Sequence, residues 1–89
     1  MKSKPFMIRL LIMMDKKYIQ DQLKAAFPEA HVVVSGDDGA HFHAQIISSM
    51  FVGKSRLQQH KMVYQALGEQ VGHDIHALSL TTQIPEEAQ

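Results

Sequence analysis

The stretch from Phe51 to Leu78 constrains the fold more than any other part of the chain, because it joins a turn, a helix and a strand. Ser55 and Gln58 have the spacing of a capping box, which opens a helix of about sixteen residues. Gly72 is well placed to end that helix as its C-cap. A helix of this length between two strands is typical of a right-handed crossover that joins parallel strands. The stretch therefore predicts that the strands before and after it run parallel in one sheet.

A helix and a β-hairpin are predicted before this stretch. Asp15 to Phe27 begins with a good N-cap and has apolar side chains at helical spacing, so it is predicted to be a helix. Pro28 ends it, because the residue before a proline avoids helical angles. Two strands, His31–Ser35 and His41–Ser49, flank Gly36-Asp37-Asp38-Gly39, whose residues suit a hairpin turn. These two strands are therefore expected to be antiparallel.

A third strand is predicted at Ile75–Thr81, and Pro85-Glu86-Glu87 resembles the first turn of a further helix. The order is then α-β-β-α-β, with a trailing α at the end. The 89 residues are enough for one small hydrophobic core. We therefore predict a single α+β domain over residues 15–89, with a three-stranded mixed sheet and its helices on one face.

Residues 1–14 imitate the start of a signal peptide, with two lysines ahead of an apolar run. An arginine interrupts that run, no small-x-small cleavage site follows it, and it is too short to span a bilayer. We expect translation to start naturally at Met13 or Met14. Residues 1–14 would then be an upstream extension that stands outside the folded domain.

The composition excludes several classes of function. Nine basic and nine acidic residues cancel, which disfavours non-specific nucleic-acid binding. The chain has no cysteine, so it can form neither a disulfide framework nor a thiolate metal site by itself. This is compatible with a reducing compartment, and we expect a cytoplasmic protein. No Ser/His/Asp arrangement, carboxylate pair or Walker-type loop can be read in the sequence, so we do not expect an enzyme.

Six histidines make imidazole the most plausible carrier of any chemistry. His41 and His43 lie on the same face of a predicted strand and could give two imidazoles to one metal, or could be ordinary polar residues of a solvated face. His76 stands at the start of a strand, where the chain leaves a loop and functional groups are often presented. His60 is expected to be a packed, structural residue. The inward side of its helix is predicted to consist of Leu57, His60, Val63, Tyr64, Leu67 and Val71.

A basic cluster surrounds the turn that opens the second predicted helix, and it consists of Lys54, Arg56, His60 and Lys61. It resembles the start of a helix-turn-helix recognition element, and a helix N-terminus also favours phosphate. The alternative is an ordinary solvated charged face, which the zero net charge favours. DNA binding through Lys54, Arg56 and Lys61 is therefore the second hypothesis.

The pattern as a whole resembles the BolA family. The residues that carry the resemblance are Phe51-x-Gly53, Gln59-His60-Lys61 followed by Val63-Tyr64 and Leu67, and Ile75-His76-Ala77-Leu78. The segment from Ser35 to Phe42 is similar to the short-loop branch of that family, typified by IbaG (also called YrbA). The resemblance covers about Asp15 to Glu87, nearly the whole chain.

This resemblance implies a KH-like α-β-β-α-β-α fold and a non-enzymatic adaptor in iron–sulfur trafficking or in iron and stress regulation. It implies a monothiol glutaredoxin as the partner in a heterodimer that shares a [2Fe-2S] cluster and glutathione, while the isolated chain is a monomer that binds no cluster. The family ligand in the I-H-A-L motif is His76 here. A second family ligand comes from the loop between the first two strands, which here holds Asp37 and Asp38, so His41 is the nearest substitute.

Overall fold

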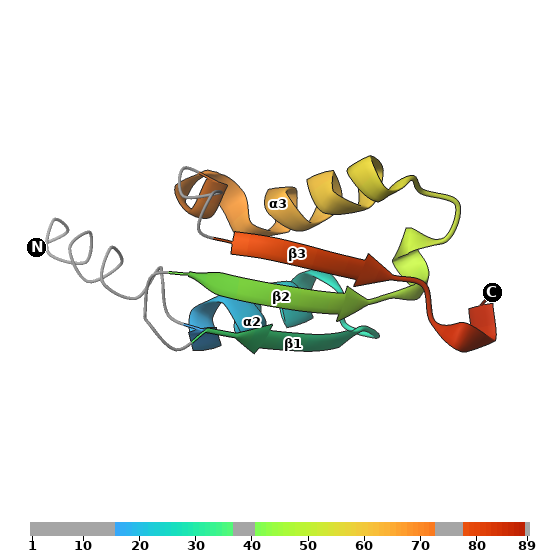
Figure 1. Cartoon of the computed structure of the whole chain (residues 1–89), viewed down its shortest axis with the longest axis horizontal. Helices are drawn as coiled ribbons and strands as arrows, with labels where there is room; N and C mark the ends of the chain where they lie inside the picture. The colour runs from blue at the N-terminus through green and yellow to red at the C-terminus, as the bar shows by residue number, and fades with distance from the viewer. Residues whose placement is uncertain (1–15, 37–40, 73–77, 89) are drawn as a thin grey trace, which may run out of the picture.

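The predicted order of helices and strands is present in this computed structural model, which describes residues 16–36, 41–72 and 78–88 (Figure 1). The elements are α2 (Lys16–Ala26), β1 (His31–Ser35), β2 (Phe42–Ile47), a 3₁₀ turn (Ser49–Phe51), α3 (Arg56–Gly72), β3 (Leu78–Gln83) and a second 3₁₀ turn (Glu86–Ala88). Four predictions fall outside the described residues: the extension over residues 1–14, the N-cap Asp15, the tip of the hairpin turn, and His76 with its neighbours.

The sheet is mixed, as predicted, with the strand order β1-β2-β3. β1 and β2 are antiparallel, with His31 opposite Ile47 at one end. β2 and β3 are parallel, with Phe42 beside Leu78 at the start of both strands. The predicted bounds of β1 are confirmed, whereas β2 is shorter than predicted. It ends at Ile47 because the Ser48 side chain accepts a hydrogen bond from the Met50 backbone N–H and caps the 3₁₀ turn.

Both helices pack on the same face of the sheet, and no other described element covers the opposite face. In Figure 1, α2 crosses behind β1 and β2, and α3 lies along β3. Alternate strand residues point into this layer, so β1 and β2 show the burial period of two that a half-buried strand requires. The core side chains are Ile19, Leu23, Phe27, Val32, Val34, Phe42, Ala44, Ile46, Phe51, Val63, Leu67 and Leu78. Burying each of the larger ones stabilises the fold by about 1.5–3 kcal/mol.

The predicted capping box at the start of α3 is confirmed. The Ser55 backbone N–H donates to Gln58 Oε1 (2.8 Å), and the Gln58 backbone N–H donates to Ser55 Oγ (3.1 Å). The predicted end of the helix at Gly72 is confirmed, but α3 is not regular up to that point. Gly68 has φ 86° and ψ 173°, so α3 is broken there. Glycine has no Cβ and adopts a positive φ readily. Of the two glycines near the C-terminus of α3, Gly68 therefore ends the regular part of the helix.

The predicted inward side of α3 is correct at its centre and wrong at its start. Val63 and Leu67 are buried as predicted, but Leu57 is 65% exposed and His60 is only partly buried. Gln59 is buried in their place, at 8% exposure. Its side chain is held by two hydrogen bonds, and these set which side of the first turn faces the sheet.

Candidate functional site

The starts of β2 and β3 lie side by side at one end of the sheet. The Cα atoms of Phe42 and Leu78 are partners there. His41 immediately precedes Phe42 and its side chain is exposed. His76 stands two residues before Leu78 in the sequence and lies outside the described residues. His41 therefore lies at the start of β2, and the roles of His41 and His76 as cluster ligands both stay predictions.

His43 lies on the open face of the sheet between two hydroxyl groups of β3. Its Nδ1 atom lies 2.7 Å from Ser79 Oγ, and its Nε2 atom lies 3.0 Å from Thr81 Oγ1. Both ring nitrogens are thus occupied by hydrogen bonds, which competes with metal ligation by His41 and His43 as a pair. Within the described ranges, no group of three or more His, Asp or Glu side chains could hold a metal ion. The described residues therefore do not complete a metal site by themselves.

The predicted basic cluster divides in the structure. Arg56 and His60 line a groove of about 360 Å³ together with β3 residues Leu80 to Gln83. They are four residues apart on α3 and so lie on the same side of the helix. Lys54 and Lys61 are exposed and are not among the described residues that line this groove. His60, predicted to be packed on the inward side of the helix, is only partly buried and lines the groove, because the first turn of α3 is rotated towards Gln59.

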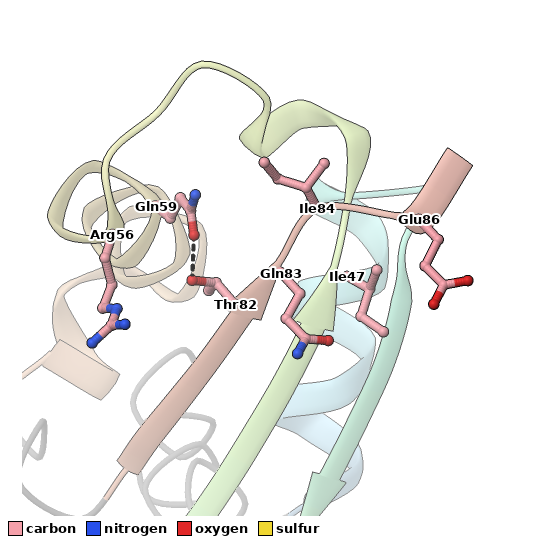
Figure 2. Close-up of a pocket in the computed structure, with 7 residues that line it drawn as sticks. All are labelled: Ile47, Arg56, Gln59, Thr82, Gln83, Ile84 and Glu86. Carbon is pink, nitrogen blue, oxygen red and sulfur yellow. Dashed lines mark hydrogen bonds between the residues drawn. The ribbon is translucent and has the colours of Figure 1, made fainter. Parts of the chain in front are cut away.

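A second, larger hollow of about 570 Å³ adjoins this groove at the end of β3 (Figure 2). Gln59 and Thr82 both line this hollow, and their side chains point toward each other. The Thr82 hydroxyl donates to Gln59 Oε1 (2.5 Å), and Gln59 Nε2 donates to the Lys54 carbonyl oxygen (2.9 Å). Arg56 projects alongside β3, while Glu86 lies on the opposite side of the hollow. Sequence reasoning does not find Gln59, because a polar residue in a first helical turn gives no signal of burial.

Glu29 joins the turn after α2 to the connection that follows β2. Its carboxylate accepts hydrogen bonds from Ser48 Oγ (2.7 Å), the Ser49 backbone N–H (3.0 Å) and Ser49 Oγ (3.0 Å). The Ser48 hydrogen bond is the main reason that the pKa of exposed Glu29 lies below its ordinary value; desolvation of the carboxylate opposes this, and the Ser49 hydrogen bonds add to it. Ser48 is fully buried, so its hydroxyl serves this connection and not nucleophilic chemistry.

These features define a small α+β domain with a sheet face that the described helices leave uncovered, an exposed histidine directly before β2, and a groove between α3 and β3. None of the described helices is long and apolar enough to cross a membrane. The sequence matches the BolA family, described as BolA-like protein, over residues 18–87. Because this match covers more than half of the chain, the protein belongs to the BolA-like family. The short-loop branch stays a prediction.

Individual relatives agree with this assignment. The chain is 32% identical over 80 residues to the DNA-binding transcriptional regulator BolA of Escherichia coli, covering 79% of this chain and 75% of that protein. It is 39% identical over 57 residues to human BolA-like protein 1, covering 64% of this chain and 41% of that protein. The solved structure of a BolA homologue from Coxiella burnetii superposes with a TM-score of 0.65 at 40% identity, covering 78% of this chain and 88% of that one. The chain spans less than half the length of the human, mouse and bovine BolA-like protein 1 sequences.

Proposed function

We propose that this protein is a non-enzymatic adaptor that binds a monothiol glutaredoxin and shares a [2Fe-2S] cluster with it. The observation that supports this most is the pairing of Phe42 with Leu78, because it aligns the two strands that His41 and His76 precede in the sequence. Membership of the BolA-like family supports the same proposal. His76 is the main ligand in this proposal, and His41 is the second.

The side chains of this protein could supply part of the ligands of such a shared cluster. The chain has imidazoles but no cysteine, so in this proposal the thiolates come from the glutaredoxin and from glutathione. His41 is exposed at a sheet end, where a partner can approach it. Replacing thiolate by neutral imidazole removes negative charge from a cluster and raises its reduction potential. Imidazole can also be protonated near neutral pH, so the shared cluster should be held less firmly in mild acid, which suits transfer.

The test is to mix the protein with a cluster-loaded, glutathione-bound monothiol glutaredoxin and to follow visible absorption and circular dichroism. We expect a new spectrum for the wild type, its loss in His76→Ala and a weaker change in His41→Ala. His31→Ala is the matched control, because His31 is an exposed histidine paired with Ile47 at the other end of the sheet. An unchanged spectrum for the wild type, or full cluster sharing by His76→Ala, would refute the proposal.

A second candidate function is a DNA-binding regulator. The relatives from Escherichia coli and Haemophilus influenzae, at 32% and 36% identity, are both named DNA-binding transcriptional regulators. Lys54, Arg56 and Lys61 are exposed around the start of α3 in this chain, where they could contact phosphates. This function predicts salt-dependent binding to a specific duplex, and each lysine or arginine removed should lower the salt slope by about one. Lys24→Ala, on the exposed side of α2, is the control.

A further inference from the structure

β3 is an edge strand with part of its outer edge unpaired. Among the described strands it has a neighbour on one side only, because the strand order is β1-β2-β3. The Gln83 carbonyl accepts from the Ser48 backbone N–H and so faces β2 (3.0 Å). The Leu78 carbonyl accepts from the Tyr64 hydroxyl of α3 and so faces outward (3.4 Å). Since successive strand residues face opposite edges, Leu80 and Thr82 direct their backbone N–H and C=O groups outward.

The groove described above is lined by the two residues that carry these outward groups, Leu80 and Thr82. The rest of its described lining is Thr81 and Gln83 of β3 and Arg56 and His60 of α3. Across the part of the chain that the structure describes, no hydrogen bond reaches the outward backbone groups of Leu80 and Thr82. The Gln59–Thr82 hydrogen bond fixes the start of α3 against β3, so the groove is already formed without an occupant. An unpaired strand edge beside a preformed groove is the usual requirement for adding a further strand.

The backbone groups and charges that line the groove indicate which kind of molecule could bind there. A strand edge pairs with the main chain of an extended polypeptide, because only that backbone repeats amide donors and carbonyl acceptors at the right spacing. Arg56 contributes a guanidinium and His60 an imidazole, and the described lining holds no carboxylate. Glu86 belongs to the neighbouring hollow, on the far side of Gln83. The groove therefore favours carboxylates near Arg56 and His60 and disfavours them towards Glu86.

We propose that the groove between α3 and β3 is a docking site for an extended, acidic peptide segment of a partner protein, which adds as a strand to β3. This inference stands on the groove itself and does not rest on the cluster-sharing function. A second copy of this chain is a poorer occupant, because its other edge strand, His31–Ser35, carries no carboxylate.

The test is a titration of the isotope-labelled full chain with a short acetylated peptide of alternating glutamate and valine, followed by amide chemical shifts. We expect shifts at Leu80 and Thr82 and in the first turns of α3. Methylating alternate backbone nitrogens of the peptide removes the donors that strand pairing needs, and should weaken binding at least about tenfold. Replacing glutamate by lysine in the peptide should weaken it by a similar factor.

Variants of the protein test whether the Arg56 side of the groove holds the peptide. Arg56→Ala should weaken peptide binding by roughly fivefold or more, whereas Lys24→Ala on α2 should leave it unchanged. Equal binding of the methylated and unmethylated peptides to the wild type would overturn the proposal, and so would unchanged binding by Arg56→Ala.

Displacement of the peptide by a single-stranded oligonucleotide that binds more tightly would assign the groove to nucleic acid. Shifts at Leu80 and Thr82 that depend only on protein concentration would assign it to self-association. Either result would also overturn the proposal.

Discussion

The clearest energetic prediction concerns Glu29 and the buried hydroxyl that it holds. Glu29→Ala removes the acceptor of Ser48 Oγ, and Ser48 has an exposed fraction of 0%. Ser48 Oγ still accepts from the Met50 N–H in this variant, but a buried O–H donor that loses its acceptor costs about 1–3 kcal/mol. The two hydrogen bonds from exposed Ser49 can be replaced by water at little cost. We therefore expect Glu29→Ala to lower the free energy of unfolding by about 1–3 kcal/mol. Urea unfolding followed by circular dichroism measures this.

The pH dependence of stability at the same position gives a second measurement. The pKa of Glu29 is lower in the folded protein than its ordinary value of 4.5, so the unfolded chain binds the proton more readily. The contribution of the carboxylate is therefore fully present above the ordinary pKa and is lost as the pH falls through the folded pKa. The stability difference between wild type and Glu29→Gln should be constant near neutral pH and shrink in acid below about pH 4.5.

A double-mutant cycle with Ser48→Ala provides the control. The coupling between Glu29→Ala and Ser48→Ala should be about 1–2 kcal/mol, because the two side chains share one hydrogen bond. Glu87→Ala, an exposed carboxylate in the last 3₁₀ turn, should change stability by less than about 0.5 kcal/mol. The reasoning is refuted if Glu29→Ala is as stable as the wild type, or if the Glu29→Gln difference persists unchanged in acid.

Three further predictions concern α3 and the core. Gln59→Ala should lower stability by about 1–2 kcal/mol, because the carbonyl of Lys54 and the hydroxyl of Thr82 both lose a partner; amide exchange in the first turn of α3 should rise with it. Gly68→Ala should destabilise by about 1 kcal/mol through its left-handed φ alone, since no atom lies within 4 Å of the added Cβ; a gain in the unfolding midpoint would contradict this. Ile46→Ala, in a fully buried position on β2, should cost about 2–5 kcal/mol against about 0.5–1.5 kcal/mol for Ile46→Val, both measured by urea unfolding.

Sequence reasoning succeeds where one local rule decides the structure. The β-branched run His31–Ser35 has the burial alternation of a half-buried strand, and its predicted bounds are correct. The capping box at Ser55 needs only a hydroxyl and an amide at fixed spacing, so it can be found without knowledge of the fold. The length of the crossover helix likewise indicates that β2 and β3 are parallel.

It fails where a distant contact decides the structure. Helical periodicity places Leu57 inside and Gln59 outside, but the Gln59 side chain bonds to Thr82, a residue 23 positions away, and this contact sets the rotation of α3. The break at Gly68 is not predicted, because two glycines stand near the helix end and periodicity does not say that the first of them interrupts the helix. The rotation of α3 also divides the basic cluster, which the sequence predicts as one surface, so that only Arg56 and His60 share the groove with β3.

The position of β2 in the middle of the sheet has a consequence for the order of folding. The β1–β2 hairpin closes over a short loop, but His43 meets Ser79 only across 36 residues of chain. Contacts between residues this far apart in the sequence form late. Closing the long loop between them costs chain entropy before the contacts contribute any favourable energy. On the ribosome, the hairpin and α3 can emerge before β3 is complete. The pairing of the two strand starts and the groove therefore form only in the last step of folding, so binding at either place should report on the fully folded chain alone.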